Sequence, residues 1–467
     1  MPPQQGSRRR RAEDDDGGAE GVDRLSDLPE ELRLHILGRL NSARDAARTS
    51  VLSRRWRGLW TGLPELTFRG VATGSVEAAL AQITGPTALD LLDVRIREPA
   101  VTPGRVSSLL RAAARLGPKM LSIGGDDDDD PEKWSRPEAH STFDLPCLER
   151  TTSLEISISK MSLAPPPAGE FAALTSLSII WGRIDSRALL PLCPCLHVLV
   201  LDMCLWPGSD AIVHLPLLEE LVLNAEFLDC IDIEAPVLKK VDVEVLVEDE
   251  LRVSFFAPRV EQFDWCLRYE YNIDVAFGQL WRMDSVRGLH IQGQLPCLKI
   301  QLSADPDLIV EDWDFAEGVA QLRFPNFSAL ELDILTKGHV FGPMVLHLLQ
   351  IRPVIRRLRI SLEENDECTV NFPCSENCRC KQPNNWRSES VPLTNLEVVE
   401  IVDLGGKDHE LDFLKLLLQC ATVLKRMTVR LVDGVSSKEI RRIYKKYPNV
   451  ECVEEEQNRE VVKWGAN

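Results

Sequence analysis

Hydrophobic residues recur at two different spacings along this chain, and each spacing predicts its own kind of structure. In residues 23–60 the spacing is helical, because one apolar set falls three or four positions apart on a single helical face: Leu32, Ile36, Leu37 and Leu40. Pro29 and two glutamates precede this set, which suits a helix N-terminus, and Asn41 ends the pattern. The first predicted element is therefore a short helix that starts after Pro29.

Two further short helices are expected in the same region. One covers residues 44–49, and the other begins at Ser53, a residue type that caps helices. The inner side of the last helix would carry Trp56, Leu59 and Trp60. Three helices in so short a stretch cannot enclose a large core, so some apolar side chains are expected to face a partner. A helical cap on the next domain, without a partner, is the alternative interpretation.

After residue 68 the spacing changes to an apolar residue, two arbitrary residues, a second apolar residue, one arbitrary residue and a third apolar residue. Four successive copies are the clearest, and each follows a proline: Leu196-Leu199-Leu201, Leu218-Leu221-Leu223, Leu238-Val241-Val243 and Val260-Phe263-Trp265. Their first positions lie 22, 20 and 22 residues apart. Such a period is typical of a leucine-rich-repeat solenoid.

The alternating pair of each copy predicts a short strand with its apolar side chains facing inward. Stacked copies would form one parallel sheet, and residues 103–116 and 411–424, which have helical spacing, would cover its convex side. Weaker copies extend the series in both directions: Leu89-Leu92-Val94, Leu121 with Ile123, Leu154 with Ile156, Leu174-Leu177-Ile179, Val286-Leu289-Ile291, Phe327-Leu330-Leu332, Ile355-Leu358-Ile360, Leu396-Val399-Ile401, Leu424-Met427-Val429 and Val450 with Val453. Longer gaps predict insertions over about 292–325 and 361–392.

The predicted fold class is thus an α/β solenoid of leucine-rich repeats, with one parallel strand per repeat, preceded by a small three-helix module. An ordinary parallel α/β domain is the alternative, and the fixed spacing disfavours it. Across the 467 residues, 44 % are hydrophobic, which is enough for a sizeable core.

Charge and composition narrow the class of partner. The chain has 54 Lys and Arg against 72 Asp and Glu, a net charge of −18, which disfavours nucleic acid and anionic membranes as main partners. It lacks an apolar run long enough for a bilayer, and its first residues lack the apolar segment of a secretory signal. The 13 cysteines are therefore interpreted as thiols in a reducing compartment. Residues 1–22 are expected to be disordered, and Arg8–Arg11 is a candidate nuclear-import signal, so we expect the nucleus, the cytoplasm or both.

Candidate metal and catalytic chemistry is sparse. The run Asp126–Asp130 lacks the alternation of a calcium loop and is interpreted as a solvated charge run. Cys374, Cys378 and Cys380, with Cys368 before them, have the donors for zinc but not the usual pair of separated knuckles. We therefore predict a compact loop of thiols, with no metal and no cofactor.

Two other features of the sequence point away from catalysis. Cys193 and Cys195 belong to a repeat turn and are expected to pack. The chain has 8 histidines, none in a recognisable nucleophile motif, and it contains neither G-x-S-x-G nor a phosphate-cradling G-x-x-x-x-G-K. No enzymatic activity is predicted.

The stretch LSDLPEELRLHILGRL, followed by ARTSVLSRRWRGLW, resembles an F-box of the plant type. The matching positions are the Leu28-Pro29 pair, Ile36 with Leu37, the run 48–53, and Trp56 with Trp60. The resemblance implies docking onto a Skp-type adaptor, which joins F-box proteins to a cullin and a RING subunit. Ten residues of this module are expected to form the adaptor-binding site, some on the surface that faces the adaptor and some in the module's own core. They are Leu25, Leu28, Pro29, Ile36, Leu37, Leu40, Val51, Leu52, Trp56 and Trp60.

A second resemblance covers VPLTNLEVVEIVDLGGKDHELDFLKLLLQCATVLKRMTV and the preceding NCRCKQPNNW, which are similar to the FBD region of plant F-box proteins. It implies four parts: a tail at 1–22, an F-box at 23–68, a leucine-rich-repeat solenoid at 69–392, and an FBD-like segment at 393–467 that closes the solenoid. The implied function is the non-catalytic substrate-recognition subunit of a Skp–cullin–F-box ubiquitin ligase.

An unidentified target protein would then bind the concave strand face or the late-repeat loops. Glu220, Asp242 and Asp264 are candidate contacts there, and the acidic balance favours a basic patch on the target. Two alternatives stay open: a solenoid scaffold without ubiquitin transfer, and a small-molecule co-receptor of the F-box type. The co-receptor would need a basic pocket, for which the clustered residues are Arg352, Arg356, Arg357 and Arg359.

Overall fold

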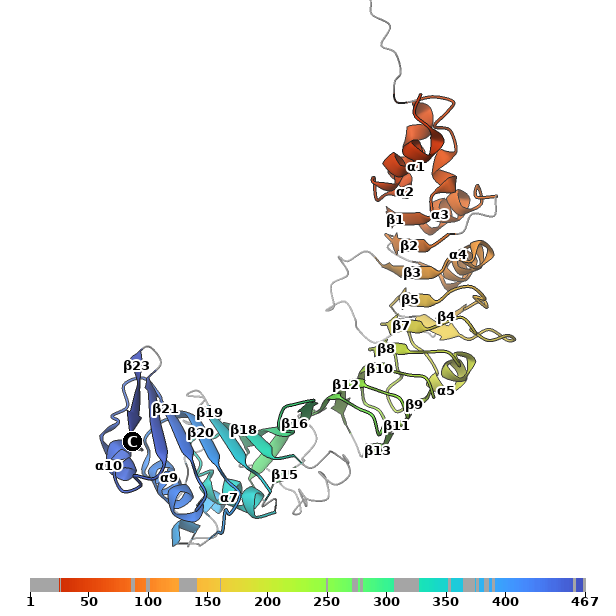
Figure 1. Ribbon diagram of the computed structural model, residues 1–467. Coiled ribbons are helices and arrows are strands. Elements are labelled where there is room, and N and C mark those ends of the chain that lie inside the picture. The colour runs from red at the N-terminus through yellow and green to blue at the C-terminus, as the bar shows by residue number, and fades with distance from the viewer. Residues whose placement is uncertain are drawn as a thin grey trace, which may run out of the picture.

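Strands laid side by side along the chain form a curved sheet, with a small helical unit at its N-terminal end (Figure 1). The computed structural model describes residues 25, 27–84, 89–97, 101–125, 141–159, 161–248, 251–270, 276–277, 280–305, 327–351, 354–363, 374, 378–381, 386–388, 391–456 and 459–464. Several predicted features lie outside the described residues: Arg8–Arg11, Asp126–Asp130, Arg352, Cys368 and most of residues 361–392.

The N-terminal unit contains α1 (Glu30–Gly38), α2 (Ala43–Arg48) and two 3-10 helices, η1 (Thr49–Val51) and η2 (Leu59–Gly62). Asn41 takes a positive φ of 48° and separates the first two helices, as predicted. The side chain of Ser42 then caps α2 by accepting a hydrogen bond from the Asp45 backbone N–H at 3.2 Å. The sequence therefore located both helices within one or two residues.

The third predicted α-helix is wrong. The chain passes through turns over residues 54–58 and forms only η2, because Gly58 takes the left-handed conformation at φ 72° and interrupts any continuous helix. Trp56 and Trp60 are nevertheless buried, each 3 % exposed. The hydrophobic spacing thus predicted correctly that the two tryptophans face inward, but it predicted the wrong backbone conformation for this segment.

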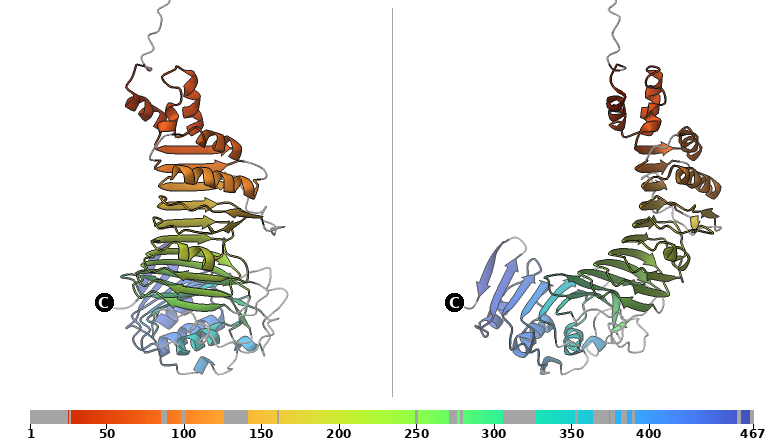
Figure 2. Two further views of the ribbon diagram at one scale, coloured as in Figure 1. Left: turned by 90° about the vertical axis from the view of Figure 1, so that its right-hand side faces the viewer. Right: turned by 45° about the vertical axis from the view of Figure 1, so that its right-hand side comes forward.

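One sheet of 18 strands runs through the described residues, and its strands pair in chain order, except that the strand at 262–269 pairs with the strand at 281–291 and not with the two-residue strand between them. Its strands are β1 (Glu65–Val71), β2 (Leu91–Ile96), β3 (Met120–Gly125), β5 (Ser153–Ser157), β7 (Ser176–Ile180), β8 (Val198–Asp202), β10 (Glu220–Glu226), β12 (Lys240–Val247), β14 (Gln262–Tyr269), β15 (Ala276–Phe277), β16 (Trp281–Ile291), β17 (Cys297–Ala304), β18 (Ala329–Leu335), β19 (Arg357–Glu363), β20 (Val398–Leu404), β21 (Arg426–Leu431), β22 (Glu451–Glu456) and β23 (Arg459–Trp464). These strands line the concave side of an arc, and helices cover its convex side (Figure 2).

The convex layer is partly helical and partly made of small sheets. Its helical elements are α3 (Thr73–Leu80), α4 (Pro103–Leu116), α5 (Ser186–Leu189), η4 (Leu190–Leu192), α7 (Gly342–Ile351), η5 (Arg379–Lys381), η6 (Trp386–Ser388), α9 (Asp408–Cys420) and α10 (Lys438–Tyr444). Its strands are β4 (Ser141–Asp144) with β6 (Met161–Ala164), and β9 (Asp210–His214), β11 (Cys230–Glu234) and β13 (Arg252–Phe256). None of the described helices has the length and apolar character needed to cross a membrane.

The four clearest repeats stack in the predicted register. Leu199 pairs with Leu221, Leu221 with Val241, and Val241 with Phe263. The second inward row follows the same order: Leu201, Leu223, Val243 and Trp265. All these side chains are buried, so apolar residues of successive strands form continuous rows, as a solenoid core requires.

The prediction of a parallel strand at Val286-Leu289-Ile291 is wrong in direction. β16 runs antiparallel to all three strands that pair with it, β14, β15 and β17. A bulge near Ser285 shifts the register, so Trp281, Met283 and Val286 are buried while Ile291 is 44 % exposed. Hydrophobic alternation does not encode strand direction. The first predicted insertion begins with a strand, β17, which pairs in parallel with β18.

The last repeat also differs from its prediction. In β22 the partners of Met427 and Val429 are Cys452 and Glu454, not Val453. Glu454 is 1 % exposed and occupies an inward position normally held by an apolar side chain. It is neutralised there by Arg441 of α10, whose Nε lies 3.0 Å from the carboxylate. A charge is tolerated at this position because its partner comes from the covering helix.

Candidate functional site

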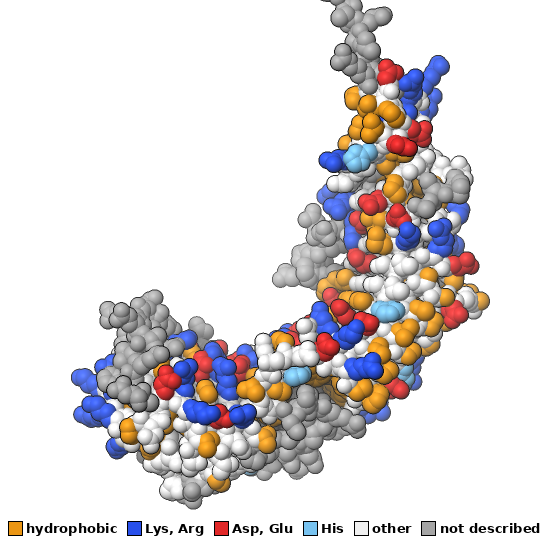
Figure 3. Space-filling model, in the orientation of Figure 1, with side chains coloured by type: hydrophobic (Ala, Val, Ile, Leu, Met, Phe, Trp, Pro, Cys, Tyr) orange, Lys and Arg blue, Asp and Glu red, His pale blue; other side chains and the backbone are white. Residues whose placement is uncertain are grey.

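The N-terminal helical unit exposes a group of large apolar side chains. Its members, which we call the apolar tip, are Leu25 (58 % exposed), Leu32 (50 %), Ile36 (37 %), Leu40 (43 %), Val51 (87 %) and Leu52 (64 %). Figure 3 shows hydrophobic side chains gathered at this end of the molecule. The other exposed large apolar residues of the described chain are spread along the solenoid from Met120 to Val432. Such a concentration on one small unit is typical of a protein-binding surface.

Helix α1 creates much of the apolar tip. Leu32 and Ile36 are four residues apart on α1 and lie one above the other as an exposed stripe, and Leu40 is exposed in the turn that follows the helix. The neighbouring face carries Arg33 and Leu37, which are buried. The helix therefore has apolar residues on two faces. One face packs into the core of the helical unit, and the other is exposed to solvent.

The buried face is held to the turn that replaced the third helix. The guanidinium of Arg33 donates a hydrogen bond to the backbone carbonyl of Arg55. Arg55 in turn lies 2.9 Å from the Asp27 carboxylate, at the start of the unit. These contacts fix the orientation of α1 and hence of its exposed stripe.

The ten residues predicted to bind the adaptor divide into two groups. Leu37, Trp56 and Trp60 lie in the core, with exposures of 1–3 %, so they support the surface and are not direct contacts. Leu28 is half-buried, and the remaining residues are exposed: Leu25, Pro29, Ile36, Leu40, Val51 and Leu52. Leu32, which was not among the ten, is 50 % exposed on the same helix as Ile36, and its four-residue spacing from Ile36 carried the signal.

The concave strand face carries acidic side chains on adjacent strands. Asp242 of β12 is the register partner of Asp264 of β14. Burial raises the pKa of Asp242, and the negative charge of Asp264 adds to this effect. Asp264 accepts a hydrogen bond from Arg287 Nε at 2.6 Å, and Glu220 lies 3.8 Å from Lys240. Of the three predicted contacts, Asp242 is thus the one without an ion pair among the described residues.

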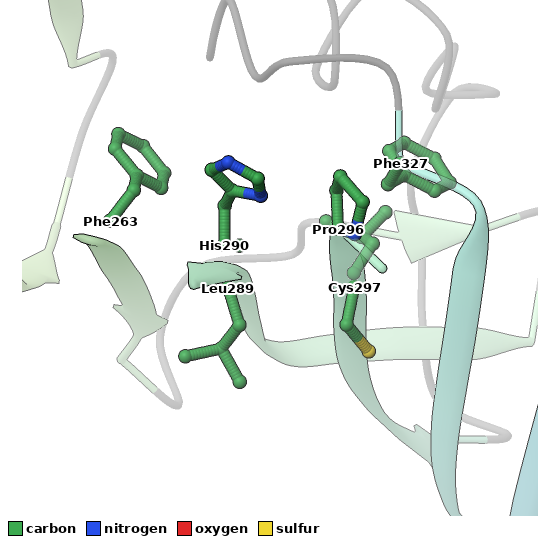
Figure 4. Close-up of a pocket in the computed structure, with 8 residues that line it drawn as sticks. Phe263, Leu289, His290, Pro296, Cys297 and Phe327 are labelled. Carbon is green, nitrogen blue, oxygen red and sulfur yellow. The ribbon is translucent and has the colours of Figure 1, made fainter. Parts of the chain in front are cut away.

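The described arginines of the cluster are all paired with carboxylates. Arg356 pairs with Glu397, and both Arg357 and Arg359 pair with Glu400. A shallow hollow with a cavity volume of about 10 Å³ lies nearer the middle of the sheet, where His290 sits between Phe263 and Pro296 (Figure 4). It is smaller than usual ligand sites, which measure about 300–1,000 Å³. Neither feature supports the small-molecule co-receptor.

The cysteine loop contains a residue that sequence reasoning missed. His339, in the turn before α7, joins Cys374, Cys378 and Cys380, and one donor atom from each residue lies within 4.8 Å of the others. We call this group the thiol–histidine cluster. His339 stands 39 positions before Cys378, outside any local motif, so spacing along the chain gave no signal for it.

Burial sets the protonation of the thiol–histidine cluster. It raises the pKa of Cys374 and Cys380, which favours neutral thiols in the absence of a cation. It lowers the pKa of His339, with help from Lys337 and Lys381, so the ring is neutral at pH 7. By contrast, Cys193 in the repeat turn is fully buried, as its predicted packing role requires, and Cys195 is half-buried.

Comparisons with known proteins find one family match in the N-terminal part of the chain and another in its C-terminal part. The F-box-like family matches residues 25–61, and the FBD family matches residues 392–429. An Arabidopsis thaliana protein named for its F-box, FBD and LRR repeats is 26 % identical over 462 residues, covering 88 % of this chain and 89 % of the relative. An FBD-associated F-box protein of the same plant is 23 % identical over 437 residues, covering 87 % and 92 %.

A shorter match reaches higher identity. Another F-box/FBD/LRR-repeat protein of Arabidopsis thaliana is 59 % identical over 46 residues, which is 10 % of each chain. Together these findings confirm the resemblance to plant F-box proteins with leucine-rich repeats and an FBD segment. The apolar tip lies within the F-box-like match.

Proposed function

We propose that this chain is the substrate-recognition subunit of a Skp–cullin–F-box ubiquitin ligase, which binds a Skp-type adaptor through the apolar tip. The supporting observation is that six large apolar side chains of the F-box-like region are exposed while its tryptophans are buried. Burying one such side chain contributes about 1.5–3 kcal/mol. The tip therefore has enough apolar surface to form the centre of a protein interface.

The proposed role is non-catalytic. The solenoid would hold a target protein, and the adaptor, cullin and RING subunit would hold the ubiquitin-charged enzyme, so that ubiquitin transfer gains from high effective concentration. We propose the concave strand face as the target surface. The carboxylate of Asp242, which has no ion pair among the described residues, favours a target with a basic group there.

The experiment measures binding of the purified chain to a Skp-type adaptor. The double substitution Val51→Glu with Leu52→Glu places two charges on the most exposed part of the tip, where neither side chain supports the core. We expect the adaptor affinity to fall at least about 100-fold, as for the loss of a central hot spot. Replacing Leu28 and Pro29 with Ala is also expected to abolish the interaction while the solenoid stays folded.

Val354→Glu is the matched control, because Val354 is 50 % exposed but lies in the turn before β19. It should bind the adaptor like the unaltered chain. Unchanged binding of the Val51, Leu52 variant would contradict the proposed interface. A chain that never co-purifies with the adaptor would favour the scaffold alternative.

A further inference from the structure

We propose that the thiol–histidine cluster is a structural zinc site, formed by His339, Cys374, Cys378 and Cys380. Three thiols and one imidazole are a common donor set for structural zinc. One donor atom from each of the four residues falls within 4.8 Å of the other three, although the residues come from separate segments. This inference is independent of adaptor binding, which concerns the opposite end of the chain.

The distances are close to those of a tetrahedral site. Zinc bonds of about 2.3 Å to sulfur and 2.0–2.1 Å to nitrogen place neighbouring donors roughly 3.5–3.8 Å apart. The Sγ atoms of Cys374 and Cys380 are 3.5 Å apart, and Cys378 Sγ lies 3.3 Å from His339 Nδ1. All donor pairs lie within 4.8 Å, so donor movements of about 1 Å or less would seat the ion.

The surroundings also suit a bound cation. His339 is 3 % exposed, and the nitrogen that it turns towards the thiols is Nδ1, which would be the zinc ligand. A buried imidazole in contact with thiols is costly unless something satisfies its polar atoms. The Val340 backbone N–H donates to Cys380 Sγ, which would stabilise a thiolate. Lys337 and Lys381 lie close enough to act electrostatically on His339, and they would offset the net negative charge of three thiolates around zinc.

Zinc at this position would fasten the second predicted insertion to the convex helices. Three ligands come from that insertion, and His339 comes from the turn between β18 and α7. The same insertion supplies Trp386, which is fully buried against the start of α7 at Gly342. A metal link would give the insertion a second attachment to the segment that leads into α7.

The test is the metal content of the full chain, purified with zinc in the medium and then dialysed, measured by inductively coupled plasma mass spectrometry. We expect about one zinc per chain. Cys378→Ser and His339→Asn should each reduce this content about tenfold. Cys195→Ser is the matched control, since Cys195 is a half-buried thiol outside the cluster, and it should retain the metal.

A second readout on the unaltered chain avoids any folding defect of the variants. Cys374, Cys378 and Cys380 should react slowly with N-ethylmaleimide, and a chelator should speed their labelling while leaving Cys195 unchanged. Adaptor binding by Cys378→Ser would show that the F-box end remains folded. A metal-free unaltered chain, full zinc content in Cys378→Ser, or a Cys374–Cys380 disulfide in the native protein would each overturn the proposal.

Discussion

At the scale of single residues, Gly342 shows how closely the convex layer is packed. A Cβ atom at this position would lie 2.9 Å from Cζ3 of Trp386 and 3.3 Å from Cδ2 of Phe413. Trp386 is fully buried, and Phe341 packs edge-on against Phe413 with ring centroids 5.2 Å apart. None of these rings can move away without disturbing the others, so glycine is required here by space.

Replacing Gly342 with Ala is therefore expected to destabilise the fold by about 1–3 kcal/mol, the usual cost of overpacking a core. The measurement is the urea midpoint of unfolding. Gly104→Ala is the control, because Gly104 lies in the first turn of α4 with open space around its Cα. That change should be neutral or stabilise by about 0.5–1 kcal/mol. Equal midpoints for both variants would show that the tryptophan contact does not restrict this site.

At the scale of elements, the strands of the solenoid depend on their neighbours for burial. Leu221 of β10 is fully buried between Leu199 of β8 and Val241 of β12. No single strand encloses its own apolar face, so a cavity in one strand also weakens the two beside it. Leu217, in the turn before β10, is 42 % exposed and lacks this role.

We expect Leu221→Ala to cost about 2–5 kcal/mol, as for other large-to-small changes in a core. Leu217→Ala should change stability by about 0.5 kcal/mol or less. Amide hydrogen exchange should show the loss of protection in β8 and β12 as well as β10. Loss confined to β10 would mean that the strands are energetically independent.

The elements also show what the sequence predicts well and what it does not. The bounds of α4 and the register of β8 to β14 followed from apolar spacing, because local burial decides both. The direction of β16 is defined by the strands that pair with it, and the absence of the third helix depends on the backbone conformation of Gly58. His339 joined three cysteines only through the fold. Features created by distant contacts carry little local signal.

At the scale of the whole molecule, the arc separates the two surfaces that we propose for binding. The apolar tip stands at the N-terminal end of the sheet, and the concave strands extend away from it (Figures 1 and 2). An adaptor on the tip would leave the concave face open to a target. The two sites can then bind independently, as a subunit that links a ligase to its target requires.

Hydrogen exchange of the full chain, with and without a Skp-type adaptor, tests this account most directly. The account predicts that the adaptor slows exchange in residues 28–52, at α1, α2 and η1, and leaves β8 to β14 unchanged. Protection along the concave strands instead, or no protection anywhere at saturating adaptor, would contradict it.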